Sequence, residues 1–452
     1  MSDQPRPLPS QPDQSPTHAL DQVRWVIDRF AGADQPDWAA PDEDELLEHF
    51  TEHFLTVIPA ERIVTTLSSQ AALFQDELSV THATRERVQA GLAGLQIQAA
   101  TEPEPPHRLT GLALFPDGQQ ITDPRLAAGP SRPLGDVPAA AREIADSTAT
   151  ELALPGLVLA GCGPDGAEWV LARGWADLDR ERPLRPDHRF PAFSITKLVT
   201  AVTVLRLVAD GAVQLDAPAN DYLREVRLAD PEATVRALLT HTAGADSPGP
   251  AELFARQVPA LVTVTGPVVG SRGSRGTFAY SNGGYALLGQ LISDVTGQPY
   301  EETARGLVLS PLGMADSWFP ARWPDDPEAV TGYGVAEQDF RAVSVICALP
   351  AAGGLWSTAA DLIRFARTWP GLLPADLAAE AVRPQATRPD DGVQVGLGWI
   401  VNQAQGLTGH TGGGRGGSSS LLVTDGGRIH LALTNRLLPI EPVNKKVLEA
   451  VS

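Results

Sequence analysis

The spacing of apolar residues changes along the chain and divides it into differently built parts. Apolar side chains first recur at helical spacing in three stretches, residues 19–30, 43–54 and 59–74. Four runs then alternate with a period near two and predict strands at 78–81, 87–91, 95–99 and 109–115. Helices followed by a meander of strands predict a small α+β domain over residues 17–125.

The remainder of the chain mixes helices and strands, which predicts a larger α/β domain over residues 138–452. Its expected elements are a helix at 134–149, strands near 156–161 and 168–176, a helix that starts near 194, a mostly helical insertion over about 200–330, strands at 394–402, 418–424 and 428–435, and a closing helix at 441–451. A segment rich in Pro, Gly and Asp precedes it, and we expect residues 126–137 to form a linker. Residues 1–16 are rich in Pro, Gln and Ser and are expected to be a disordered tail.

Composition and charge exclude several classes of function. The chain has 452 residues, of which 43% are hydrophobic, and its formal net charge is −20. So acidic a chain is not expected to bind nucleic acid or an anionic membrane surface. Because the N-terminal segment lacks a signal-peptide core and no long apolar run follows, we expect a cytoplasmic protein. The two cysteines, Cys162 and Cys347, are expected to be buried free thiols.

The strongest chemical signal is the pattern Ser194-x-x-Lys197, which opens a long apolar run. Residues three apart lie on one face of a helix, so the hydroxyl and the amine would meet at its first turn. A serine hydroxyl is a weak nucleophile until a base removes its proton, and a buried amine can serve as that base. Asp210-Gly211 is expected to end the helix. On its own, however, the pattern Ser-x-x-Lys often occurs by chance.

Two further motifs make the Ser194-x-x-Lys197 signal more specific. Tyr280-x-Asn282 precedes an apolar helical run and supplies a phenol for proton transfer and an amide for binding an acyl group. His410-Thr411-Gly412-Gly413 lies between strand-like runs, where glycines let a substrate approach the backbone of a strand. The glycines of this segment also match a dinucleotide-binding pattern, but a strand follows where that fold needs a helix.

In this order, the three motifs resemble those of the serine β-lactamase and penicillin-recognising superfamily. Tyr280-x-Asn282 is similar to class C β-lactamases, D-Ala-D-Ala carboxypeptidases and family VIII esterases, not to class A enzymes. The flanks around Leu238–Gly244, Phe278–Tyr285 and Pro350–Asp361 agree, and the resemblance covers about residues 134–452. It implies an antiparallel sheet backed by the terminal helices, with the active site between the sheet and a helical subdomain.

The resemblance also implies the site residues. Ser194 would be the acylated nucleophile, and either Lys197 or Tyr280 would take its proton, an alternative that stays open. Asn282 would bind the acyl group, together with the strand residues His410, Thr411, Gly412 and Gly413. The oxyanion hole would be the backbone N–H groups of Ser194 and Gly413. We assign no catalytic role to His241, because the corresponding segment in relatives is mainly structural.

One departure bears on the substrate. Many β-lactamases carry lysine where this chain has His410, and that ammonium pairs with the carboxylate of the β-lactam. A histidine at this position weakens the case for β-lactam hydrolysis. We therefore expect a serine hydrolase that acts on small acyl esters, with a β-lactamase or a D-amino-acid peptidase or amidase as the alternative. A catalytically idle ligand-binding protein with this fold is the alternative from another class.

The smaller domain is similar in outline to NTF2-like folds. An NTF2-like module before a β-lactamase-like domain also resembles the clavulanate-cluster serine hydrolases in architecture. The module could bind a hydrophobic ligand, form a wall of the active site or mediate a homodimer, and the last two need no special residues. His49 and His53 lack a third ligand, so no metal is expected, and no organic cofactor is implied.

Overall fold

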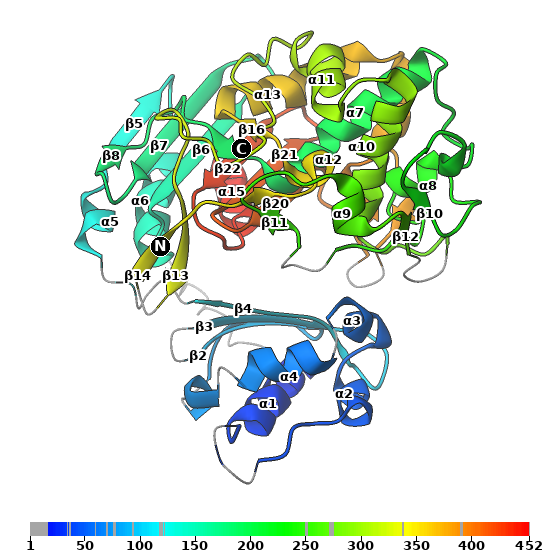
Figure 1. Cartoon of the computed structure of the whole chain (residues 1–452). Helices are drawn as coiled ribbons and strands as arrows, with labels where there is room; N and C mark the ends of the chain where they lie inside the picture. Colours follow the sequence, from blue (N-terminus) through cyan, green and yellow to red (C-terminus); the bar gives the residue numbers. More distant parts are fainter. Residues whose placement is uncertain are drawn as a thin grey trace, which may run out of the picture. The chain divides into compact units, whose positions relative to one another are not determined.

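The structure, a computed structural model, describes residues 17–451 with several gaps. The gaps are residues 34, 36–37, 59, 69–70, 76–77, 93–94, 117–120, 122, 249–251, 271–274, 337–338 and 389–391. The chain divides into two compact units, Met1–Asp117 and Gly118–Ser452 (Figure 1). The predicted tail, residues 1–16, lies outside the described residues.

The first unit packs helices against a four-stranded antiparallel sheet of strand order β1-β2-β3-β4. Its elements are α1 (His18–Phe30), α2 (Glu43–His49), α3 (Glu52–Val57), α4 (Ala60–Ser68), a 3₁₀ turn (Ala71–Gln75), β1 (Ser79–Ala83), β2 (Arg87–Leu92), β3 (Leu95–Thr101) and β4 (Leu109–Pro116). The helix expected over 43–54 is two helices. Phe50 is extended and the Thr51 hydroxyl accepts the N–H of Phe54, so the chain ends one helix and caps the next.

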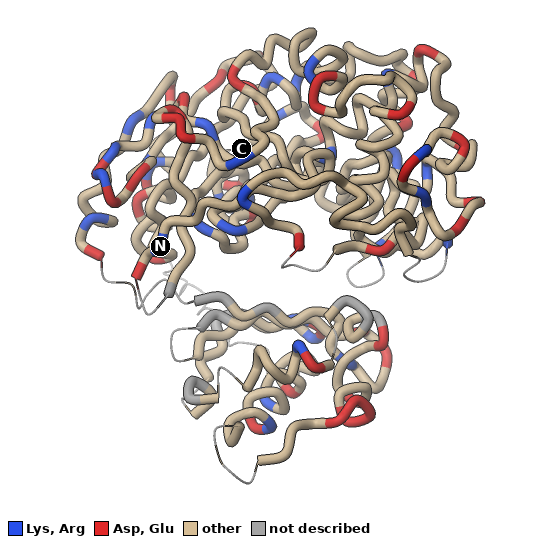
Figure 2. Tube along the Cα trace, in the orientation of Figure 1, with Lys and Arg blue, Asp and Glu red and all other residues tan. Residues whose placement is uncertain are grey.

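Aromatic and aliphatic side chains give this unit its own hydrophobic core. Phe30, Phe50 and Leu109 are fully buried, and they pack with apolar residues from α1, α2 and the sheet. The Asp42 carboxylate caps α2, whose first turn carries three more acidic residues, and red marks this helix in Figure 2. Carboxylates in the first turn stabilise the helix, because they interact favourably with the positive end of its dipole. The likeness of this unit to NTF2-like folds stays a prediction.

The second unit is built on a ten-stranded sheet in which every neighbouring pair is antiparallel. Its order is β17-β18-β19-β20-β21-β22-β6-β7-β5, with β8 paired to β7. The strands are β5 (Ser131–Leu134), β6 (Gly156–Cys162), β7 (Glu168–Asp177), β8 (Arg182–Pro183), β17 (Ala386–Thr387), β18 (Gln394–Val395), β19 (Ile400–Asn402), β20 (Leu407–Gly414), β21 (Gly417–Thr424) and β22 (Ile429–Thr434).

Helices cover both faces of this sheet (Figure 1). The helices of the second unit are α5 (Pro124–Ala128), α6 (Ala139–Glu151), α7 (Thr196–Ala209), α8 (Val235–Leu239), α9 (Leu261–Thr265), α10 (Asn282–Thr296), α11 (Tyr300–Ala304), α12 (Pro350–Gly353), α13 (Ala359–Thr368), α14 (Ala375–Val382) and α15 (Glu441–Ala450). Short paired strands join the connections: β9 (Phe190–Pro191) with β16 (Trp356–Ser357), β10 (Arg227–Leu228) with β12 (Val268–Val269), β11 (Phe254–Ala255) with β15 (Ile346–Cys347), and β13 (Gly332–Ala336) with β14 (Asp339–Val343).

The central strands are apolar on both faces because each face meets a helical layer. In β6, Leu157 and Leu159 point into the core shared with α6 and α15, whereas Val158 and Ala160 point into the core of the helical subdomain. The expected α/β domain with an antiparallel sheet and a helical subdomain is therefore confirmed.

The segment expected as a linker, residues 126–137, differs from the prediction. It holds the end of α5 and the edge strand β5, which pairs with β7 inside the second unit. Pro133 is compatible with an edge strand because no second neighbour needs its missing N–H. The predicted helix 134–149 starts later, at Ala139 directly after Pro138. Within the described residues, no helix is both long and apolar enough to cross a membrane.

Candidate active site

Ser194 sits in a tight turn that leads into the most buried helix of the subdomain. A 3₁₀ turn, Phe193–Ile195, precedes α7, and nearly every residue of α7 is buried. Phe193 has a φ of +46°, which is strained for a residue with a side chain by roughly 1 kcal/mol. This turn leaves Ser194 only partly buried at the entrance of the helix. As predicted, α7 ends at Ala209, and Gly211 takes a φ of +74°.

The Lys197 amine is completely buried and contacts three oxygen atoms. Its Nζ donates to the Asn282 Oδ1 at 2.8 Å and to the Ala352 carbonyl at 2.8 Å, and it lies 3.1 Å from the Ser194 Oγ. A neutral amine could donate to the two carbonyl oxygens and keep its lone pair toward the hydroxyl. The arrangement therefore suits proton transfer from Ser194 to Lys197.

The start of α10 fixes the Asn282 side chain. The Ser281 hydroxyl caps the helix by accepting the Gly284 N–H, and it donates to the Asp246 carbonyl. The Asn282 N–H donates to the Ser247 hydroxyl at 3.2 Å. Asn282 is thus held through its backbone N–H, and its side-chain amide oxygen accepts from the Lys197 amine.

Tyr280 stands at the edge of the site, 40% exposed, and its ring is held by aromatic neighbours. The Lys197 Nζ lies 4.9 Å from the centre of this ring, and the His241 ring lies 4.4 Å away. His241 is buried, and its Nδ1 accepts the N–H of Ser281. Burial first, and the Lys197 charge second, hold the pKa of His241 well below its usual range. A neutral His241 thus anchors the turn before α10 through its bond to Ser281, and its lack of a catalytic role stays a prediction.

His410 lies on β20, with its side chain buried beside the other site residues. Its ring centre is 6.3 Å from that of Tyr280, and its Nδ1 lies 2.5 Å from the Thr411 carbonyl, which suits an Nδ1–H donor. Desolvation, assisted by the Lys197 charge, lowers the pKa of His410 to about 3. The imidazole is therefore neutral at physiological pH, which gives this position no positive charge.

The glycines of β20 bring its backbone against the Ser194 turn. A methyl group on Gly412 would fall 2.7 Å from the Ala192 carbonyl and 2.8 Å from the Ser194 nitrogen. Gly414 and Gly417 close a two-residue hairpin, so the neighbouring Gly413 directs its N–H to the edge opposite β21. Among the described residues, the β19 ladder ends at Gly409, which leaves that edge unpaired at Thr411 and Gly413.

The structure thus brings the three motifs together: Ser194, Lys197 and Asn282 in direct contact, Tyr280 and His410 beside them, and Thr411, Gly412 and Gly413 on the adjoining strand. Sequence reasoning missed two contributors. The Ala352 carbonyl is a backbone group, and only its position in the family-like flank from Pro350 could have indicated it. The Ser419 hydroxyl, which donates to the Ala192 carbonyl at 2.8 Å, ties β21 to the nucleophile turn.

Comparisons with known proteins agree with this geometry. The family model described as "Beta-lactamase" matches residues 141–450, so the first unit lies outside it. Esterase EstB of Burkholderia gladioli is 32% identical over 263 residues, which cover 48% of this chain and 66% of the esterase. Penicillin-binding protein 4 of Amycolatopsis lactamdurans is 30% identical over 237 residues, which cover 49% of this chain and 61% of that protein. The matches thus span less than two thirds of either curated relative.

Solved structures show the same fold. A D-amino acid amidase from Ochrobactrum anthropi SV3, complexed with L-phenylalanine amide, is 25% identical with a TM-score of 0.59, covering 69% of this chain and 97% of the amidase. A penicillin-binding protein from Bacillus halodurans is 21% identical with a TM-score of 0.61, covering 70% of this chain and all of that protein, which is a likeness of fold. With a family model that spans more than half of its residues, and with the motif residues gathered at one site, this chain belongs to the beta-lactamase family.

Proposed function

We propose that the chain is a serine hydrolase that works through a covalent acyl-Ser194 intermediate. The observation that carries the proposal is the set of contacts around Lys197, whose amine meets the Ser194 hydroxyl while two fixed carbonyl oxygens take its other donors. An amine held in this way is oriented to act as the base that activates the serine. A protein retained only for ligand binding would not need this set of contacts.

In the proposed reaction, the Ser194 Oγ attacks the carbonyl carbon of the substrate while its proton passes to Lys197 or, through it, to Tyr280. The carbonyl oxygen gains the negative charge, and the N–H groups of Ser194 and Gly413 stabilise it. The carbon–oxygen bond of the ester breaks, and the leaving alkoxide takes the proton. Water then hydrolyses the acyl-enzyme, which releases the acid and restores the Ser194 hydroxyl.

We propose small uncharged esters as the preferred substrates. The neutral imidazole of His410 cannot form an ion pair with a substrate carboxylate, which a lysine at that position could do. The relative from Burkholderia gladioli, named as an esterase, supports this choice. Hydrolysis of amides of D-amino acids is the second candidate, because a structural relative is named as a D-amino acid amidase. The likeness to penicillin-binding protein 4 keeps β-lactams as a third class.

The test is turnover of three probes by the full chain: a short-chain p-nitrophenyl ester, a D-amino acid amide and nitrocefin. Ser194→Ala should abolish turnover of the preferred probe, by up to about a million-fold if the groups act as a unit. The exposed Ser310, which lies outside the site, gives the matched control Ser310→Ala. Mass spectrometry should find the acyl group on Ser194. Turnover retained by Ser194→Ala would refute the mechanism, and turnover of the amide alone would replace the ester as substrate.

A further inference from the structure

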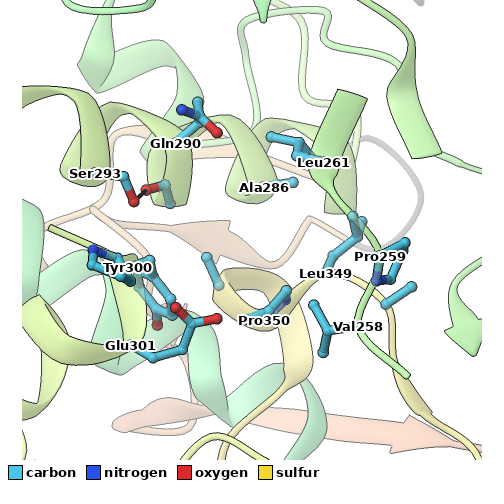
Figure 3. Close-up of a pocket in the computed structure, with 14 residues that line it drawn as sticks. Val258, Pro259, Leu261, Ala286, Gln290, Ser293, Tyr300, Glu301, Leu349 and Pro350 are labelled. Carbon is cyan, nitrogen blue, oxygen red and sulfur yellow. Dashed lines mark hydrogen bonds between the residues drawn. The ribbon is translucent and has the colours of Figure 1, made fainter. Parts of the chain in front are cut away.

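A cavity lies in the second unit, outside the site described above. It has a volume of about 240 Å³ and is lined by segments around α9, α10, α11 and α12 (Figure 3). Its described lining residues include none of Ser194, Lys197, Tyr280, Asn282 or His410. A cavity of about 150 Å³ is large enough to bind benzene, so this one has room for an aromatic ring with a short chain.

Two elements that line the cavity also hold Lys197. Residues of α10 form one wall, and this helix carries Asn282 at its start. Pro350 and Ala351 of α12 form another, and the next residue, Ala352, supplies the second carbonyl that binds the amine. Tyr300 also lines the cavity, and its hydroxyl contacts the buried Thr200 hydroxyl at 2.8 Å. The cavity therefore sits against the elements that orient the catalytic amine.

The body of the cavity is apolar, and its polar groups include hydrogen-bond acceptors. The Gln290 amide nitrogen donates one of its two N–H groups to Asp294, so Gln290 keeps both a donor and an acceptor. The Ser293 hydroxyl donates to the Gly289 carbonyl, so its lone pairs stay available (Figure 3). Among the described lining residues, Glu301 carries the only charge, and Figure 3 places its carboxylate beside Pro350. Acceptors and one carboxylate suit a ligand that donates hydrogen bonds and carries positive charge.

We propose that this cavity is a second ligand site, which takes a small primary ammonium compound with an apolar body. The ammonium group pairs with the Glu301 carboxylate, the only charge among the described lining residues. The apolar body packs on Leu261, Ala286 and Leu349. The carboxylate repels an anionic ligand of the same size, and a neutral ligand binds more weakly because it cannot form the ion pair.

Titration of the full-length Ser194→Ala chain with phenethylammonium, followed by ligand-observed NMR, tests the proposal without turnover. Glu301→Gln should weaken the binding by about fivefold, the size of one partly exposed ion pair. Glu302→Gln is the matched control, because this neighbouring carboxylate pairs with Arg305 and does not line the cavity. The neutral analogue 2-phenylethanol should bind equally to both variants. Equal phenethylammonium binding in both variants, or no binding at millimolar concentration, would overturn the proposal.

A cavity-filling variant and a kinetic assay locate the binding independently. Ser293→Leu adds side-chain volume inside the cavity and should abolish binding of both compounds, with circular dichroism to show that the variant folds. The kinetic assay rests on the proposed function. In it, phenethylammonium should not compete with the ester, and competitive inhibition insensitive to Glu301→Gln would place the ligand at Ser194 and overturn the proposal. A chain without ester turnover would refute the proposed function alone, because the titration needs no activity.

Discussion

Lys197 on α7 and His410 on β20 are buried to nearly the same degree, yet their side chains have different oxygen partners. The Lys197 amine meets three oxygen atoms from Ser194, Asn282 and Ala352. The His410 ring meets one carbonyl, and the charge of Lys197 opposes a second positive charge there. Burial makes a charge costly on both sides, and the amine has three oxygen partners where the imidazole has one.

The difference assigns separate tasks to the two sides. The proposed proton transfer belongs to the Lys197 side, because its amine lies 3.1 Å from the Ser194 hydroxyl. In the same proposed reaction, the β20 side offers backbone N–H groups and a neutral ring, which would bind the substrate carbonyl without pairing with a substrate charge. Substitutions that remove the amine, the phenol or the imidazole should therefore have effects of different kinds and sizes.

The largest effect is expected from Lys197→Ala. Loss of the base should lower kcat for the ester by about a thousandfold or more, measured with the p-nitrophenyl probe. The variant also leaves the Asn282 and Ala352 oxygens without their buried donor, which should cost about 1–3 kcal/mol for each in urea unfolding. Lys445→Ala, which breaks only a surface pair with Glu441, is the control for both measurements. A Lys197→Ala variant with a tenth of the original rate would exclude the amine as the base.

A smaller effect is expected from Tyr280→Phe. The ring contacts with His241 and Lys197 do not need the hydroxyl, so the variant should fold with an unchanged Tm. Loss of a proton relay should reduce kcat by about a hundredfold. Tyr222→Phe is the control: it removes a phenol outside the site that accepts the backbone N–H of Gln214, and it should leave kcat unchanged. Full activity in Tyr280→Phe would assign the whole proton transfer to Lys197.

The smallest effect is expected from His410, and it concerns how the free energy of unfolding depends on pH. Burial lowers the pKa of His410 to about 3 and the pKa values of His188 and His430 to about 4. Since the unfolded chain binds these protons near pH 6.5, the free energy of unfolding should fall as pH drops below about 6.5 and continue falling toward pH 4. Each histidine contributes a slope of at most about 1.4 kcal/mol per pH unit.

Urea unfolding of the second unit between pH 7.5 and 4.5 measures this slope. His410→Gln should make the decline shallower below pH 6 and leave the slope above pH 7 unchanged, which serves as the internal control. An unchanged slope in the variant throughout would mean that His410 binds its proton at the same pH in the folded and the unfolded chain. The imidazole would then be charged below about pH 6.5, and the preference for uncharged substrates should disappear there.

The sequence was sufficient to predict the elements that depend on local pattern. The spacing in Ser194-x-x-Lys197 sets one helical turn, and the structure places the two side chains 3.1 Å apart. The alternating apolar runs likewise correspond to β1 through β4 of the first unit. The membership of the family followed from three motifs in order, which no single motif could have indicated.

Features that depend on distant partners could not be predicted in this way. Residues 131–134 contain Pro133 and resemble a linker, but they form β5 because the edge of β7 is available to them. The Ala352 carbonyl joins the site only because α12 packs beside α7. A backbone group leaves no side-chain signal, and the folded arrangement alone shows which carbonyl is near the amine.

Gly289 shows how a residue outside the site can control it. A methyl group at this position would lie 2.5 Å from the Ala351 side chain, so α10 and α12 can pack this closely only because residue 289 has no side chain. These two helices carry both carbonyl oxygens that hold the Lys197 amine. Directed evolution toward new substrates should therefore find substitutions that alter the rate at helix contacts that no substrate reaches. When variants are recombined, α7, α10 and α12 should be exchanged together.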